Sequence, residues 1–245
     1  MSPIPQEHTS AYAWSRYKAE VADLVRAKDR PDIIEIGAGR SPLFTRDDLP
    51  ANVGSYTIND ISQSELDRAP EGWTRACFDI CGDVSPIRAR YDVAFTRMLA
   101  EHVPDGPRFH ANVFRLLKPG GVAFHFMPTL YSPPFVINKL LPETLSRKVL
   151  NAFFRHRNEN EIPKFPARYS MCHGASGRLI ARYKSIGYGE VDIRTFYGHD
   201  YFASIPILRD VDRVLSNTAY KRGMTLFGSY AYVTLGKSVH SPAHA

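Results

Sequence analysis

The chain has 245 residues, 44% of them apolar, with three cysteines and a formal net charge of +6. This length and apolar content are typical of one domain with a substantial core, and so few cysteines exclude a disulfide framework and favour a reducing compartment. The positive charge favours anionic partners such as nucleic acid, acidic glycans or lipid headgroups, although no run of five basic residues concentrates it.

The N-terminal stretch has no basic segment followed by an apolar run, and no window approaches 18 uninterrupted apolar residues. Neither a signal peptide nor a membrane span is therefore predicted, and we expect a cytoplasmic protein. Cys77 and Cys81 lack two further ligands nearby, so we expect them to be buried strand residues and not a zinc site.

Helix and strand patterns alternate along the first half of the chain. Thr9 or Ser10 can cap a first helix that extends to Lys28. A buried strand follows over 32–37, and the stretch after Gly39 looks like the start of a helix. Further strands are predicted over 56–60, 74–79, 91–96 and 122–127, with a helix over 108–117 that ends in a turn over 118–121.

The second half is less regular, with a helix predicted over about 175–185 and strands over 190–196 and 229–235. A helical piece over 205–216 separates these two strands. Alternating strands and helices at this spacing imply right-handed crossovers and an open, doubly wound sheet. No repeat or linker divides the chain, which favours a single domain over 1–245.

The turn after the first predicted strand lies where an open parallel sheet binds its ligands. Gly37 and Gly39 allow a close approach, but Pro42 stands where a dinucleotide site has its third glycine, and no Gly-Lys-Ser/Thr of a P-loop follows. Glu35 precedes the turn. Two glycines and a carboxylate suit a cofactor without phosphates, such as S-adenosylmethionine with its positive sulfonium.

Five segments in this order resemble class I S-adenosylmethionine-dependent methyltransferases: "IIEIGAGRS", "INDIS", "CFDI", "YDVAFTRMLAEHV" and "FRLLKPGGVAFHF". The resemblance implies an α/β, Rossmann-like fold with a doubly wound, mostly parallel seven-stranded sheet whose seventh strand is antiparallel. It divides the chain into a cap helix (1–30), a cofactor-binding half (31–127) and two substrate-cap insertions, one after the fifth strand (128–172) and one between the sixth and seventh (198–225).

The resemblance also implies the cofactor, S-adenosylmethionine, and its product S-adenosylhomocysteine. Asp60 would take the ribose hydroxyls, and Asp79 would meet the adenine amino group with Ile80 beside the ring. The expected cofactor-binding residues are Glu35, Gly37, Ala38, Gly39, Asn59, Asp60, Asp79, Ile80, Thr96 and Arg97. No metal is expected, because the acids Asp47 and Asp48 do not follow the fourth or fifth strand, where metal-dependent relatives carry theirs.

Methyl transfer is an in-line displacement in which orientation supplies much of the rate, and a hydroxyl acceptor gains from a general base. His102, soon after the fourth strand, is the first candidate for this base, and His173 and Tyr169 are the second. Each of the three can equally serve in packing. His125, on the fifth strand, is expected to be a core histidine, and His199 follows the sixth strand and could reach the site.

The two cap insertions are aromatic and basic, which favours a small or glycan-like acceptor methylated on oxygen, as in polysaccharide or glycolipid pathways. The segment over 135–154 reads as an amphipathic helix that either touches an anionic membrane or packs on the domain. Nitrogen methylation, an RNA substrate and a non-catalytic cofactor-binding protein remain alternatives. RNA is disfavoured because no nucleic-acid module is recognised, and an NAD-dependent oxidoreductase is disfavoured by Pro42.

Overall fold

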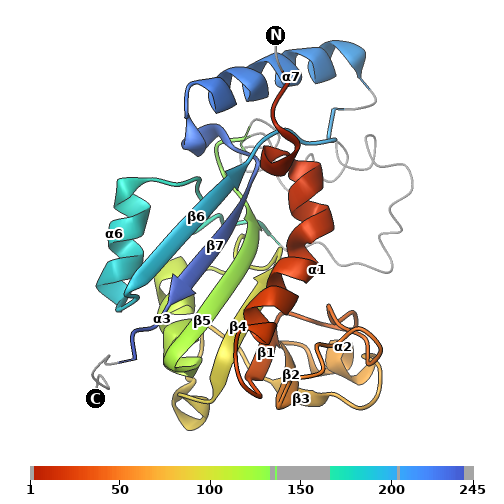
Figure 1. Cartoon of the computed structure of the whole chain (residues 1–245), viewed down its shortest axis with the longest axis vertical. Coiled ribbons are helices and arrows are strands. Elements are labelled where there is room, and N and C mark those ends of the chain that lie inside the picture. Colours follow the sequence, from red (N-terminus) through yellow and green to blue (C-terminus); the bar gives the residue numbers. More distant parts are fainter. Residues whose placement is uncertain (1–2, 133–135, 137–165, 203–204, 240–245) are drawn as a thin grey trace.

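The computed structural model describes residues 3–132, 136, 166–202 and 205–239. Seven strands form one sheet in the order β3-β2-β1-β4-β5-β7-β6 (Figure 1). Neighbouring strands pair in parallel except β7, which is antiparallel to both β5 and β6. The predicted doubly wound, mostly parallel sheet of seven strands is confirmed.

The strand positions follow the hydrophobic pattern of the sequence. The strands are β1 (Asp32–Ile36), β2 (Ser55–Asp60), β3 (Thr74–Cys77), β4 (Tyr91–Arg97), β5 (Leu117–Pro128), β6 (Glu190–Phe196) and β7 (Tyr230–Gly236). Central β1 is buried along nearly its whole length, as expected of a strand covered on both faces. The edge strands β3 and β6 expose charged side chains, Arg75 and Arg194 among them, which discourages pairing with another chain.

Helices cover both faces of the sheet. They are α1 (Ser10–Arg26), α2 (Gln63–Asp67), α3 (Gly106–Leu116), α6 (Gly177–Ile186) and α7 (Pro206–Lys221), with short turns η1 (Gln6–His8), η2 (Ser85–Ile87) and η3 (Thr225–Phe227). Figure 1 shows α1 across one face, α3 and α6 on the other, and α7 above the end of β6. Four helices begin at a side chain that accepts an N–H of the first turn: Thr9, Ser62, Asp105 and Ser176.

An aromatic layer packs α1 onto the sheet. The Tyr17 ring stacks on Phe124 at 5.6 Å between centroids and on Phe126 at 5.4 Å. The Tyr17 hydroxyl donates to the backbone oxygen of Thr96 at 2.9 Å. On the opposite face of the sheet, against Phe109 and His110 of α3, His125 is fully buried and bonds Thr96 Oγ1 through Nδ1 at 2.9 Å; burial lowers the pKa of His125 to about 3. The prediction of a core histidine is confirmed, although Nε2 has no hydrogen-bond partner among the described residues.

The expected helix after Gly39 is absent. Residues 37–54, all described, form turns and bends. The reason is that Glu35 accepts the backbone N–H of Leu43 at 2.8 Å, which draws Leu43 and Phe44 into the core and prevents the chain from coiling. The prediction of a helix here was wrong.

Three smaller predictions also differ from the structure. β3 ends at Cys77, two residues earlier than expected, and because it is an edge strand Cys77 is exposed and Cys81 partly exposed; they are not buried strand residues. The expected turn over 118–121 lies inside β5, where the register against β4 shifts and Gly120 takes a φ of +77°. Helix α7 continues to Lys221, beyond the expected end.

Most of the first cap insertion, including the segment over 135–154, lies outside the described residues. No helix among those described is long and apolar enough to cross a bilayer. The subdivision of the chain into cap and cofactor-binding parts stays a prediction.

Candidate functional site

The glycine turn over 37–39 follows β1 and is hydrogen-bonded to the carboxyl end of β2. The backbone N–H groups of Gly37 and Ala38 both donate to the backbone oxygen of Asn59 at 2.9 Å. Gly37 has a φ of +76°, and a Cβ there would lie 2.8 Å from Leu99 Cδ1. Glycine is therefore required by backbone conformation and by contact with the loop after β4, so that this loop covers the turn.

Asp60, at the end of β2, faces the turn with one oxygen. Asp60 Oδ1 accepts the backbone N–H of Ser62 at 2.9 Å. A Cβ on Gly39 would lie 3.5 Å from Asp60 Oδ2, so this oxygen borders the space that the missing side chain leaves open. An ionised carboxylate can accept two hydrogen bonds from neighbouring hydroxyl groups, which is the geometry that a ribose diol offers.

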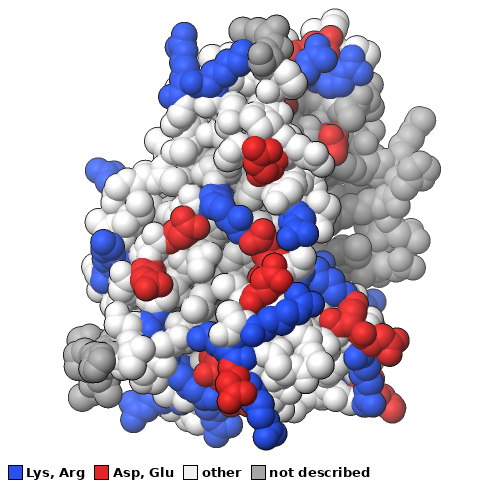
Figure 2. Space-filling view, in the orientation of Figure 1, with Lys and Arg blue, Asp and Glu red and all other residues white. Residues whose placement is uncertain are grey.

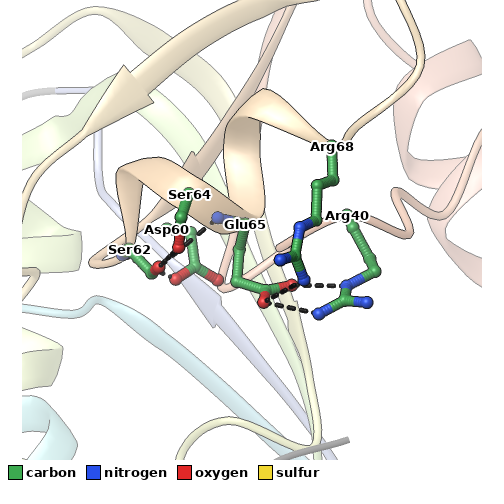
Figure 3. A network of polar contacts seen from close by, with 6 residues as sticks. All are labelled: Arg40, Asp60, Ser62, Ser64, Glu65 and Arg68. Carbon is green, nitrogen blue, oxygen red and sulfur yellow. Dashed lines mark hydrogen bonds and ion pairs between the residues drawn. The ribbon is translucent and has the colours of Figure 1, made fainter. Parts of the chain in front are cut away.

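Arg40, Glu65 and Arg68 form ion pairs close to Asp60, and we call this group the clasp (Figure 3). Arg40 Nε and Nη2 donate to the two Glu65 oxygens at 2.6 Å each, and Arg68 Nη1 lies 3.8 Å from Glu65 Oε1. The hydrogen bonds from Arg40 lower the pKa of Glu65. Bidentate pairs of this kind fix geometry, so the clasp holds the turn after β1 against α2.

Two predicted cofactor residues, Glu35 and Thr96, are buried and have their side chains engaged within the protein. Glu35 is buried and accepts hydrogen bonds from Leu43 N and from the Tyr56 hydroxyl; burial raises the pKa of Glu35. Thr96 is fully buried, and its hydroxyl is engaged with His125. The structure thus places both inside the protein, at the base of the site.

The loop after β3 is held from two sides. Asn59 Nδ2 donates to the backbone oxygen of Phe78 at 3.0 Å, and Asn112 of α3 donates to that of Ile80 at 2.7 Å. Ile80 is buried while Asp79 beside it is exposed. This arrangement gives the loop one apolar and one acidic side chain in fixed positions near the carboxyl end of β3.

β4 ends at exposed Arg97, and the loop that follows brings His102 close to the glycine turn. His102 N donates to the backbone oxygen of Leu99, the residue that packs on Gly37, at 2.9 Å. His102 Nδ1 lies 3.3 Å from the backbone oxygen of Pro166. Because a carbonyl oxygen only accepts, Nδ1 carries the proton and Nε2 is the basic nitrogen of the neutral ring.

Glu101 is a site residue that sequence reasoning missed. Its side chain is buried, Oε1 lies 3.6 Å from His102 Nε2, and Oε2 has no hydrogen-bond partner among the described residues. Burial raises the pKa of Glu101 to about 8, so the carboxyl holds its proton at neutral pH. The sequence shows Glu101 directly before His102, but it does not show that the glutamate is buried, because burial is set by tertiary packing.

The backbone oxygen of Glu101 holds the segment that carries the other two candidates for the general base, Tyr169 and His173. This oxygen accepts the N–H groups of Arg168 at 2.6 Å and of Tyr169 at 3.0 Å. Tyr169 is therefore brought next to His102 and is itself buried. His173 lies a few residues further along, with its ring stacked on that of Tyr131 at 5.4 Å.

His199 has a different place from the one considered in the sequence. It is buried, its Nε2 lies 2.9 Å from Asp212 Oδ1, and its Nδ1 accepts the N–H of Tyr201 at 3.2 Å. His199 thus joins the loop after β6 to α7. Asp48, considered as a metal ligand, pairs with Lys18, and no group of three His, Cys, Asp or Glu that could hold a metal occurs within the described ranges.

Comparison with known proteins agrees with this geometry. A family model described as a methyltransferase domain matches residues 7–171, more than half of the chain. A search of curated proteins found no match.

Solved structures show the same fold at low sequence identity. Phosphoethanolamine N-methyltransferase 2 of Haemonchus contortus, in complex with phosphomonomethylethanolamine and S-adenosylhomocysteine, has a TM-score of 0.57 at 13% identity over 92% of this chain and 53% of its own. The CurJ carbon methyltransferase has a TM-score of 0.58 at 14% identity over 95% and 57%. An S-adenosylmethionine-dependent methyltransferase of Mesorhizobium loti has 0.52 at 16% over 89% and 98%. The chain thus spans about half the length of the first two and nearly all of the third.

Proposed function

The chain belongs to the methyltransferase domain family, and on that premise we propose that it transfers a methyl group from S-adenosylmethionine to a hydroxyl oxygen of a small or glycan-like acceptor. S-adenosylhomocysteine is the second product. All three cysteines lie within the described residues and are free thiols, which supports a reducing compartment such as the cytoplasm.

One observation carries the choice of cofactor: the glycine turn after β1 leads into a loop over 37–54 that contains no helix. A dinucleotide places its pyrophosphate on the N–H groups at a helix N-terminus after this turn. Here that terminus does not exist, and Pro42 replaces the third glycine. The edge of the sheet therefore fits a cofactor that has no phosphate groups.

The partly exposed acids at the strand ends hold the adenosine part of the cofactor. Asp60 accepts the ribose hydroxyls, and Asp79 meets the adenine amino group beside the apolar Ile80. The glycine turn lets the backbone approach the cofactor closely, and Arg97 borders the same edge. Glu35 and Asn59 support these groups by holding the loops after β1 and β3.

His102 serves as the general base. The bound cofactor supplies an electrophilic methyl group on a sulfonium, so the protein's task is to align the acceptor oxygen and take its proton. The Pro166 carbonyl fixes the tautomer that leaves His102 Nε2 basic. Tyr169 and His173 line the acceptor side, and Glu101, 3.6 Å from that nitrogen, gains a cationic neighbour when His102 takes the proton.

Calorimetric titration tests the cofactor. We expect heat with S-adenosylmethionine and S-adenosylhomocysteine and none with NAD. Asp60→Ala should weaken binding of S-adenosylhomocysteine by roughly tenfold to a hundredfold, because a hydrogen bond to a charged group contributes about 1.5 to 3 kcal/mol. Asp47→Ala, which removes an exposed acid outside the turn, is the control and should bind as the native chain does. Binding of NAD without binding of either sulfur compound would contradict the proposal.

A further inference from the structure

Helix α7 turns its apolar side chains outward. Five of them are between 41% and 77% exposed: Ile207, Leu208, Val211, Val214 and Leu215. We call this set the α7 face. At about 100° per residue the five lie within an arc of roughly 120°, which is the width of stripe that a helix normally buries against its own core.

The side of α7 that packs on the protein is small and polar. Its buried residues are Asp212, Ser216 and Ala219. Asp212 Oδ1 lies 2.9 Å from His199 Nε2, and the Tyr220 ring contacts those of His8 at 5.1 Å and Tyr197 at 5.6 Å, so several contacts hold this side of α7 on the protein. An outward apolar stripe on a helix anchored in this way indicates an interaction surface.

Further exposed apolar side chains lie beyond the α7 face. Met224, Leu226 and Phe227, in and beside η3, are 39%, 39% and 48% exposed. They follow the end of α7 directly in the chain. Between Leu215 and Met224 no large apolar side chain is exposed, so these three residues form a second apolar patch beyond the end of α7.

Basic residues accompany this surface at both ends of α7. At about 100° per residue, Arg209 and Arg213 lie on the side of the first half that is opposite the α7 face. Lys221, the last residue of the helix, lies within about 20° of the face, and Arg222 follows as the C-cap. Figure 2 shows basic side chains toward both ends of the helix, at the top of the view. Asp210 pairs with both arginines of the first half, and the other acid, Asp212, is buried. The accessible charge around the α7 face is therefore mainly positive.

We propose that the α7 face, together with the apolar residues of η3, docks onto an anionic lipid surface. An exposed apolar arc on one side of a helix, with basic residues on the other side and at its end, is the pattern of a helix that lies in the interface of a bilayer. Long basic side chains can place their aliphatic stems along the apolar layer and their charges among the headgroups. A second copy of the same face is a poorer partner, because it would bring like charges together.

The docking surface lies at the end of the sheet where the parallel strands have their carboxyl ends, which is also the end that carries the candidate site. β6 runs parallel to β1, β2, β4 and β5, so α7, which follows β6, lies at the edge that holds the glycine turn. The return to β7 stays at this edge, since Ser229 N donates to the backbone oxygen of Phe196 at 2.7 Å. Docking would thus bring the site to the lipid surface, and the acceptor is a molecule held there. That last step rests on the proposed function; the docking itself does not.

Vesicle flotation tests the docking. The native chain should float with vesicles of equimolar phosphatidylcholine and phosphatidylglycerol and stay behind with phosphatidylcholine alone. Val211→Glu and Leu215→Glu should each lower the partition coefficient by roughly tenfold, because a charge enters the apolar layer. Val239→Glu is the matched control, since Val239 is 69% exposed and lies beside Gly120, at the opposite edge of the sheet. It should float as the native chain does.

Three outcomes would overturn the proposal. The first is flotation of both α7 variants at the native level, and the second is an equal loss in Val239→Glu. The third is a dimer in sedimentation that the α7 variants dissociate, without binding of the native chain to vesicles. Circular dichroism confirms that the variants are folded. Calorimetry with S-adenosylhomocysteine tests the proposed function separately, so a failure of docking and a failure of that function are distinguishable.

Discussion

The buried carboxyl of Glu101 makes the stability of the protein depend on pH in a defined direction. Its pKa is raised to about 8 in the folded chain, against an ordinary value of 4.5. The titratable groups that face it are His102, 3.6 Å away, and the thiol of Cys172. Between these two pH values the folded chain keeps the proton while the unfolded chain has lost it, so the free energy of unfolding falls as pH rises.

Glu101→Gln removes this dependence while keeping the shape of the protonated side chain. Each pH unit lowers the free energy of unfolding of the native chain by about 1.4 kcal/mol, so the interval from 4.5 to 8 amounts to about 5 kcal/mol at most. We expect the variant to match the native chain in weak acid and to become progressively more stable than it up to about pH 8. Above that value the difference should stay constant.

Urea denaturation over this pH range measures the effect. Glu71→Gln, a change at an exposed glutamate, is the control and should follow the native curve at every pH. Parallel curves for Glu101→Gln and the native chain would refute the reasoning, because they would mean that Glu101 is ionised in the folded state.

Two further predictions concern the turn and the base of the sheet. Gly37→Ala should weaken binding of S-adenosylhomocysteine by roughly tenfold or more, because the added Cβ meets Leu99. Gly198 has a φ of +78° and open space around it, so Gly198→Ala has the same backbone cost of about 1 kcal/mol without the clash and is the control. Equal effects of the two substitutions on binding, measured by calorimetry, would contradict this prediction. Lys118→Met should lower the free energy of unfolding by about 1 kcal/mol at neutral pH, a small value because the partners are partly exposed. The hydrogen bond from Lys118 lowers the pKa of Asp32, so this contribution is present above pH 3.8 and lost as pH falls further, and a deficit that persists unchanged in stronger acid would argue against the pairing.

The sequence predicted the parts of the fold that depend on local periodicity and capping. The helix capped by Thr9, the core position of His125 and the positions of β1 to β5 along the chain follow from patterns within a few residues. The helix expected after Gly39 failed because a long-range contact, from Leu43 N to Glu35, replaced local coiling. Cys77 was misplaced because the pattern of one strand does not say whether it lies at the edge of a sheet.

The site shows the same limit. Asp60 and Gly37 could be predicted from their spacing, since a strand end and a turn are local features. Glu101 could not, because its raised pKa comes from burial by segments far along the chain. The period of α7 predicted a helix, but the outward direction of its apolar stripe depends on tertiary contacts, among them Asp212 with His199 and Tyr220 with His8 and Tyr197.

The loop between β1 and β2, where a helix was expected, limits how substitutions could change the cofactor that this chain binds. Exchanging Pro42 for glycine would restore the spacing of a dinucleotide motif, yet it would supply no helix terminus for a pyrophosphate. Eighteen residues of backbone, tied down through Leu43 and the Arg40–Glu65 clasp, would have to refold together. On the proposed function, selectivity against phosphate-bearing cofactors would depend on the path of the chain and not on a single residue.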